Sequence, residues 1–387
     1  MILTILFSIC ILALLHTYVA YPLLLQFFCH FQKSNTVSYG PGDKLPSVTV
    51  LISAYNEEHI LEEKIRSVFN TDYPIEKLEI IIGSDGSTDR TNEILGRMKG
   101  EFPRLRAEIF KQRLGKGNVL NRLVPISNHK LLLLTDAKVI FNHRTIPEII
   151  TFFKDPGVGL TGGRLVNLTH TSSGISVQEE IFMNREFTMK QQEGQLWGTV
   201  AGAYGALYAV RRELFPVIPS LFTVDDFFVT LSVSAKGYRC LMNPAATGLL
   251  NVPGAFSEEF RRKVRISIGN YQNLVHFLSL AWPPYTGLSF SFVSHKVLRW
   301  LGPFFILGAF VLNLFLFPQS DLYKIALLLQ VMLLIMPLID SILRKFNIHI
   351  VILRFVSHFY GMNAALLAGF FKYIRGIKSN VWEPTKR

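Results

Sequence analysis

The chain has 387 residues, 49% of them hydrophobic, and a formal net charge of +12 at pH 7. This length and apolarity exclude one ordinary soluble domain, and three scattered cysteines argue against a disulfide framework or a zinc site. The sequence has no recognisable nucleic-acid-binding module, so we expect the positive charge to favour anionic lipid headgroups and an anionic substrate.

The first predicted element is an apolar segment, residues 1–31. It contains no Asp, Glu, Lys or Arg from Ile2 to Phe31, which is enough helix to cross a bilayer core of about 30 Å. No basic residues precede it and no clear cleavage site follows it, so we expect a membrane anchor rather than a removed signal peptide. Lys33 and Lys44 follow closely, which places the downstream domain on the cytoplasmic side.

The next part, residues 46–255, alternates strands with helices. The predicted strands are "SVTVLISAYN", "LEIIIGSD", "RAEIFKQ" and "KLLLLTDA", and helical patterns separate them over 57–69, 90–99 and 116–126. This order predicts an α/β fold with a mainly parallel sheet and helices on both faces. In such sheets, ligands bind beyond the carboxyl ends of the strands.

Polar residues stand at the ends of the first, second and fourth predicted strands, and we expect them to converge on one rim. They are Ser53, Tyr55, Asn56 and Glu57, then Ser84 and Asp85, then Thr135 and Asp136. The carboxylates would form an acidic pocket, which suits hydroxyl groups and a divalent cation with oxygen ligands. Taken singly, Asp85 and Asp136 also fit ordinary turn residues, so the hypothesis depends on their joint placement.

The last part of the chain is predicted to meet the membrane again. Residues 256–292 are expected to form an amphipathic or interfacial segment. A transmembrane region of two or three helices follows over 293–371, with apolar runs at 297–317, 325–339 and 349–371, and a basic tail ends the chain at 372–387. If all three runs cross the membrane, the basic tail lies outside, against the positive-inside rule. A re-entrant or interfacial last run would resolve this conflict.

Five short motifs, taken in order, resemble the motif set of glycosyltransferase family 2. They are "SAYNEE" (53–58), "GSDGSTD" (83–89), "GKGNVLN" (115–121), "TDAK" (135–138) and "VDD" (224–226). The resemblance covers about residues 46–270, and the layout of the whole chain is similar to that of membrane-bound, polysaccharide-synthase-like members. It implies the GT-A fold, a nucleoside-diphosphate sugar donor and an inverting reaction.

The resemblance also implies the residues that bind the donor. Tyr55 and Glu57, with Ser53 beside them, would contact base and ribose, Asp85 would bind the base, and Lys116 would lie near the diphosphate. Arg262 and Arg265 fit a Q/R-x-x-R-W motif that could clamp the diphosphate, although Ile266 replaces its tryptophan and puts processive synthesis in doubt. The alternatives are packing for Tyr55, a solvated helix start for Lys116 and lipid contacts for the two arginines.

Asp136 matches the first acid of the family's DxD-type metal motif, which implies a Mg²⁺ or Mn²⁺ cofactor. Lys138 stands where a second oxygen ligand would be, and an ammonium group cannot bind a cation. Three alternatives remain open. The ion is held by Asp136, the diphosphate and water; Lys138 supplies part of the positive charge itself; or Lys138 points away.

Inverting transfer needs a base beside the acceptor hydroxyl. Asp226 stands eleven positions before Gly237 of "GYR", which matches the family's base, and Asp225 replaces the glutamate that usually precedes it. The alternative is an acidic pair at a helix N-terminus. Acceptor-side residues implied by the resemblance are Gly202, Tyr204, Gly205 and Asp225.

The sequence therefore predicts an inverting glycosyltransferase, with a UDP-sugar as the expected donor and a glycan or a lipid-linked acceptor. It would act at the cytosolic face of the inner membrane as a multi-pass protein, in surface polysaccharide or glycolipid synthesis. Its expected partners are the bilayer and other glycan-synthesis subunits, and no nucleic acid. The alternative is a catalytically inactive partner subunit that binds a sugar nucleotide, for which Lys138 is the one supporting feature in the sequence.

Overall fold

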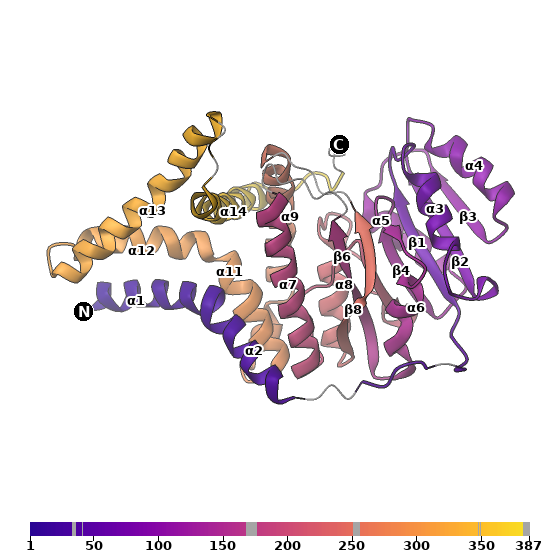
Figure 1. Cartoon of the computed structure of the whole chain (residues 1–387), viewed down its shortest axis with the longest axis horizontal. Helices are drawn as coiled ribbons and strands as arrows, with labels where there is room; N and C mark the ends of the chain where they lie inside the picture. The colour runs from indigo at the N-terminus through magenta and orange to yellow at the C-terminus, as the bar shows by residue number, and fades with distance from the viewer. Residues whose placement is uncertain are drawn as a thin grey trace.

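A computed structural model describes residues 1–32, 36–40, 42–167, 176–250, 256–346, 348 and 350–381. It places an α/β domain at one end and a group of long helices at the other, with α7 and α9 between them (Figure 1). Residues 168–175 and 251–255 of the predicted domain, His349 at the start of the last predicted apolar run, 382–387 of the predicted tail and Lys33 lie outside the described residues.

The described residues form an eight-stranded sheet in the order β3-β2-β1-β4-β7-β6-β8-β5. The strands are β1 (Val48–Ala54), β2 (Leu78–Asp85), β3 (Leu105–Phe110), β4 (Leu131–Asp136), β5 (Ile140–Phe141), β6 (Val158–Asn167), β7 (Leu207–Arg211) and β8 (Arg239–Leu250). The first four strands pair in parallel, as predicted. The other half adds antiparallel pairs through β7 and β5, so the complete sheet is mixed.

The parallel half of the sheet is buried on both faces, which explains why its strands are continuous apolar runs. Successive side chains of β1 point to opposite sides. Val50 and Ile52 pack with the side chains of α3 (Leu61–Phe69), α4 (Thr91–Glu101) and α6 (Thr145–Ile150). Leu51 packs in a second core with residues of α5 (Lys116–Ile126) and α8 (Asp225–Ala235). Helices therefore cover both faces, as the sequence predicts.

The remaining helices surround the second core and extend away from it. They are α1 (Ile2–Leu15) and α2 (Tyr21–Phe31), joined by the π-helical turn η1 (His16–Ala20), then α7 (Ser176–Trp197), α9 (Phe256–His276), α10 (Gly287–Ser291), the π-helical segment η6 (Phe292–Val297), α11 (Leu298–Trp300), α12 (Gly302–Leu316), α13 (Asp321–Lys345) and α14 (Val351–Ile374). Short 3₁₀ helices lie at η2 (Ile75–Lys77), η3 (Thr151–Lys154), η4 (Arg212–Leu214) and η5 (Leu278–Ala281). Helix α7 packs on β8 and also contacts α2, α10 and α14.

Three helices in the described part of the chain are long and apolar enough to cross a membrane: Ile2–Phe31, Asp321–Lys345 and Val351–Ile374. A fourth candidate is the pair Gly287–Trp300 and Gly302–Leu316, which bends by 60° and fits either a broken span or a re-entrant loop. The predicted apolar run over 297–317 crosses this bend, since α11 ends at Trp300 and α12 begins at Gly302. The last candidate is longer than its apolar run suggests, since it continues through Lys372 to Ile374.

Candidate active site

The carboxyl ends of β2, β1 and β4 lie side by side, because these strands are neighbours in the sheet. Ser53 near the end of β1 is in register with Gly83 of β2 and with Asp136 of β4. The rim expected from the strand ends is thus present in the structure. It brings the loop after Ser53 and the turn after Asp136 to the same edge of the sheet.

Lys116 is the residue that joins this rim to the rest of the site. It begins α5, and its Nζ lies 2.7 Å from Oδ1 of Asp136, 3.0 Å from the carbonyl oxygen of Gly205 and 3.8 Å from Oδ2 of Asp225. Burial alone would lower the pKa of Lys116, but the Asp136 and Asp225 carboxylates outweigh it and raise that pKa above its usual range. The ammonium therefore stays charged between two groups of carboxylates.

Asp85 holds the turn that leads into Lys116. Its two carboxylate oxygens accept hydrogen bonds from the backbone N–H groups of Leu114, at 2.6 Å, and Gly115, at 3.0 Å. The residue is buried, with 3% of its surface exposed. Asp85, which the family resemblance implies as the acid that binds the base of the donor, fixes the start of α5 in this structure.

Lys138, the unusual residue of the metal motif, pairs with Glu57. Its Nζ lies 3.5 Å from Oε1 of Glu57 in the loop after β1. The lysine that contacts Asp136 is Lys116. The ammonium of Lys138 thus links the two loops of the rim, and the carboxylate expected to contact the donor ribose is already paired with it.

Tyr55 stacks with an arginine that the sequence does not indicate. The guanidinium carbon of Arg113 lies 3.5 Å from the centroid of the Tyr55 ring, a cation–π contact. The neighbouring Asn56 has a φ of 52° and accepts a hydrogen bond at 2.8 Å from the backbone N–H of Thr88. These contacts connect the loops after β1, β2 and β3 into one wall of the site.

Lys64 contacts both sides of the turn after β4, which follows Asp136. The sequence did not predict this residue as part of the site. Its side chain from α3 is fully buried, and its ammonium donates to Oγ1 of Thr135 and to the carbonyl oxygen of Val139. It also lies 3.4 Å from the centroid of the Phe141 ring. Burial lowers the pKa of Lys64 well below its usual range, and the Asp136 charge opposes that shift. The turn that carries Asp136 is therefore held by two lysines.

The loop of residues 201–205, called the acceptor-side loop from here on, contains two of the predicted acceptor-side glycines and packs on the N-terminus of α8 at both of them. A Cβ on Gly205 would lie 2.8 Å from Oδ2 of Asp226, and a Cβ on Gly202 would lie 2.4 Å from the Phe227 ring. Gly202 also has a φ of +84°, which other residues rarely adopt. The predicted acceptor-side glycines thus allow the loop to approach Asp226 closely. Tyr204 is directed toward α7, where its hydroxyl donates to the carbonyl oxygen of Met183 at 3.0 Å.

The acidic pair at the start of α8 has two different environments. Oδ1 of Asp226 accepts the backbone N–H of Phe227 at 2.9 Å. Oδ2 of Asp225 is buried without a hydrogen-bond partner among the described residues. Burial raises the pKa of Asp225 to about 6; Lys116 opposes this shift, and Asp226 and Asp136 add to it. Both carboxylates adjoin the Lys116–Asp136 pair.

The two arginines that the sequence singled out in α9, Arg262 and Arg265, have different surroundings. Burial and the nearby Arg262 lower the pKa of Arg265, while the carboxylates of Asp136, Asp225 and Asp226 oppose that shift, so Arg265 lies within electrostatic reach of the site. Arg262 instead forms ion pairs with Glu179 of α7, at 3.0 Å, and Glu259, at 2.8 Å. Of the two arginines expected to clamp the diphosphate, Arg262 is thus paired with carboxylates in this structure.

No group of three or more His, Cys, Asp and Glu side chains that could hold a metal ion occurs among the described residues. Asp136, whose side chain is 46% exposed, is the carboxylate at the expected metal position. A divalent ion there would need oxygen ligands from the donor diphosphate and from water. The residues fit a cation that arrives with the nucleotide.

The whole fold resembles that of the mannosyltransferase PcManGT from Pyrobaculum calidifontis, solved in complex with GDP-Man and Mn²⁺. The TM-score is 0.73, the sequence identity is 21%, and the match covers 95% of this chain and 99% of that one. The likeness includes the apolar helices as well as the α/β domain, and it identifies the fold as the GT-A fold with added helices.

Sequence relatives match over about three fifths of the chain. A probable glycosyltransferase, YdaM, of Bacillus subtilis is 26% identical over 247 residues, which cover 61% of this chain and 58% of that protein. The poly-beta-1,6-N-acetyl-D-glucosamine synthase of Staphylococcus aureus is 25% identical over 236 residues, covering 60% and 57%. The match thus spans a little over half the length of these relatives.

The family model described as glycosyl transferase family 2 matches residues 49–218. These residues include β1, β2 and β4 with their rim, Lys116 and the acceptor-side loop. Residues 49–218 therefore form a domain that matches glycosyl transferase family 2, and relatives named as glycosyltransferases match the chain as well.

Proposed function

We propose that the protein is a membrane-bound inverting glycosyltransferase that uses a nucleoside-diphosphate sugar. The observation that carries this proposal is the position of Lys116. Its ammonium contacts Asp136 on the expected donor side and Gly205 and Asp225 on the expected acceptor side. A fixed cation between two substrates is suited to the charge that develops on a diphosphate leaving group.

In this mechanism Asp226 is the general base. The acceptor hydroxyl attacks the anomeric carbon of the donor, and Asp226 takes the proton of that hydroxyl. The bond between the anomeric carbon and the diphosphate oxygen breaks on the opposite face, which inverts the configuration. Lys116 and Arg265 oppose the negative charge that the departing diphosphate gains. Asp225, next to the base, is the second carboxylate on this side.

Asp136 is our candidate ligand for a divalent cation that binds together with the donor. Such an ion neutralises diphosphate charge when it is bound. The mannosyltransferase neighbour was solved with Mn²⁺ and a sugar nucleotide, which supports a cation in general. The ion pair between Lys138 and Glu57 supports the alternative in which the cation is held by Asp136, the diphosphate and water.

We place the reaction at the cytosolic face of the inner membrane, with a glycan or a lipid-linked molecule as acceptor. The apolar helices at both ends of the chain support a multi-pass protein, and the Staphylococcus aureus relative is a polysaccharide synthase. An inactive sugar-nucleotide-binding subunit is the rival function. Asp226, Lys116 and the close approach of Gly205 to Asp226 favour an active enzyme over that rival.

The first test is a binding panel with the purified full-length protein in detergent. UDP-sugars and GDP-mannose are added with and without Mn²⁺ or Mg²⁺, and the melting temperature is followed. At least one nucleotide sugar should raise it, because a ligand that binds the folded state stabilises that state. If no nucleotide sugar stabilises the protein under any condition, the proposed function is wrong.

A further inference from the structure

Helix α7 carries a line of buried acids that faces the apolar helices. Glu179, Glu186 and Glu193 follow one another at intervals of seven residues, which is about two helical turns, so they lie on one side of the helix. Each is at most 5% exposed. A buried carboxylate is costly unless it is paired. Glu179 pairs with α9 and α14, whereas Glu186 and Glu193 share a partner in η6.

Glu193 contacts the apolar helices with one carboxylate oxygen and the acceptor-side loop with the other. Its Oε1 accepts a hydrogen bond from the hydroxyl of Tyr21 in α2 at 2.8 Å and lies 2.6 Å from Nδ1 of His295 in η6. Its Oε2 accepts the backbone N–H of Ala201 at 3.0 Å. One fully buried carboxylate thus connects two apolar segments, far apart in the chain, to the residue that opens the acceptor-side loop.

The other end of the same loop reaches the donor side. Gly205 lies four residues after Ala201. Its carbonyl oxygen accepts a hydrogen bond from the ammonium of Lys116 at 3.0 Å, and its Cα lies against the side chain of Asp226. The loop is therefore held at its start by Glu193 and at its end by Lys116. A displacement of Ala201 would therefore also displace Gly205, which contacts Asp226.

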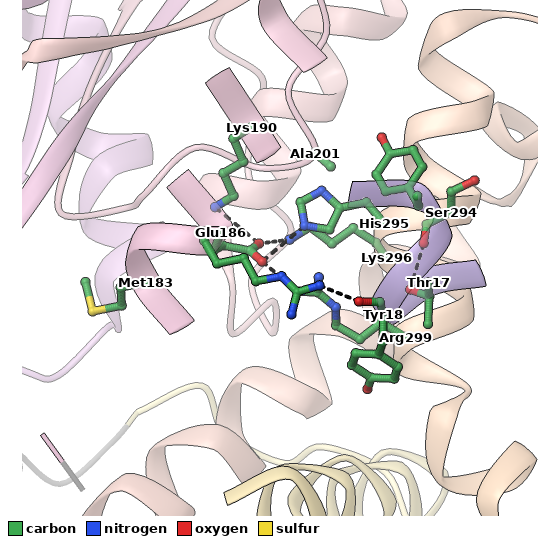
Figure 2. A network of polar contacts seen from close by, with 12 residues as sticks. Thr17, Tyr18, Met183, Glu186, Lys190, Ala201, Ser294, His295, Lys296 and Arg299 are labelled. Atoms are coloured by element: carbon green, nitrogen blue, oxygen red, sulfur yellow. Dashed lines mark hydrogen bonds and ion pairs between the residues drawn. The ribbon is translucent and has the colours of Figure 1, made fainter. Parts of the chain in front are cut away.

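The segment that holds Glu193 is itself fixed by a second acid of the line. Figure 2 shows Glu186 at the centre of a group of basic side chains, with Lys190, His295, Lys296 and Arg299 pointing toward it. Nε2 of His295 lies 3.1 Å from Glu186, and Arg299 pairs with it at 2.6 Å. His295 therefore bridges two carboxylates and has little freedom to move away from Glu193.

We propose that Glu193 is a positioning residue for sugar transfer, and that Tyr21 and His295 couple the membrane helices to the acceptor-side loop through it. The proposal rests on the proposed function, because transfer is what the loop serves. The membrane helices thereby contribute to the geometry of the site besides anchoring the protein.

The direct test compares Glu193→Ala with Glu193→Gln in the full-length protein. The Ala variant removes the acceptor of the Ala201 N–H, so hydrogen exchange over residues 201–205 should become faster and kcat should fall about 100-fold. The donor KM should stay within about twofold, since no donor-side residue is changed. The Gln variant keeps an oxygen for Ala201 and should recover most of kcat.

A matched pair in the N-terminal helix avoids the risk that a buried acid cannot be replaced without unfolding. Tyr21→Phe removes the hydroxyl that reaches Glu193. Thr17→Val removes another buried hydroxyl of the same span, one that donates to the carbonyl oxygen of Ser294 at 2.8 Å and does not touch Glu193. Tyr21→Phe should speed exchange over 201–205 and lower kcat, while Thr17→Val should do neither.

Equal behaviour of the two hydroxyl variants would overturn the proposal, since anchoring alone would then explain the contacts. Unchanged exchange over 201–205 in Tyr21→Phe and Glu193→Ala would also overturn it. Hydrogen exchange needs no substrate, so these results are distinct from a failure of the proposed function. That failure would appear as absence of sugar transfer by the parent protein with any donor.

Discussion

The ammonium of Lys116 and the carboxylate of Asp136 form an ion pair of 2.7 Å at the edge of the sheet where β1, β2 and β4 end. The strand-end acid and the helix-start lysine are both expected to contact the donor, and in this structure they contact each other. On the proposed mechanism, a bound diphosphate would share the charge of Lys116 with Asp136.

Replacement of Lys116 by Met should lower kcat about 100-fold or more, because a fixed cation beside the leaving group is lost. Steady-state transfer kinetics with the purified protein measure this effect. Lys111→Met, which changes an exposed lysine five residues earlier, is the matched control and should leave kcat unaffected. Equal rates for Lys116→Met and the parent would remove Lys116 from the mechanism.

Chelation of divalent cations should stop the reaction. EDTA should abolish transfer, and Mn²⁺ or Mg²⁺ should restore it, since Asp136 and the donor diphosphate supply the oxygen ligands. Lys138→Met should keep this dependence and lose less than about tenfold in rate, because Lys138 pairs with Glu57 and not with Asp136. A fully active enzyme in EDTA would show that lysine charge replaces the cation.

The contact between Gly205 and Asp226 gives a steric prediction. Gly205→Ala would place a methyl group 2.8 Å from Oδ2 of Asp226, and the required shift should lower kcat by about tenfold or more. Gly96→Ala is the control, since a Cβ on this residue of α4 would meet no atom within 4 Å. That change should leave transfer intact and stabilise the helix slightly. Similar kinetics for both variants would contradict the close approach.

The raised pKa of Asp225 predicts a pH-dependent stability. Its folded-state pKa of about 6 lies above the ordinary value of 3.8, so the folded protein holds this proton more tightly than the unfolded chain does. The stability contributed by Asp225 is complete below pH 3.8 and is lost as the pH rises through 6. The melting temperature of the parent should therefore fall relative to Asp225→Asn between about pH 4 and pH 7. A difference that is constant over this range would refute the shift.

The sequence predicted the parallel half of the sheet and its rim well, because each of these features depends on local order. Apolar runs that end in polar residues indicated β1, β2 and β4, and parallel strands bring their ends to one edge. The antiparallel pairing of β7 with β4 and β6 was not predicted. It joins segments separated by long stretches of chain, and strand periodicity carries no information on partners.

The missed residues of the site share one property: their partners are distant in sequence. Lys64 appears in the sequence as a charged position in an amphipathic helix, yet it is buried under a turn 71 residues later. Glu193 and His295 are 102 residues apart. An unusual signal was available for Glu193, since acids recur every seven residues along α7. Such a line is equally typical of a solvated helix face, so the sequence alone could not assign it.

Asp226 is the centre of the proposed mechanism, and its replacement by Asn tests that mechanism most directly. The measurement is transfer of a radiolabelled sugar from the donor found in the binding panel to membrane lipid and glycan acceptors. Asp226→Asn should still bind the donor and should transfer sugar at least about 100-fold more slowly, because the base is gone while the fold remains. Transfer at the parent rate by Asp226→Asn would contradict the account.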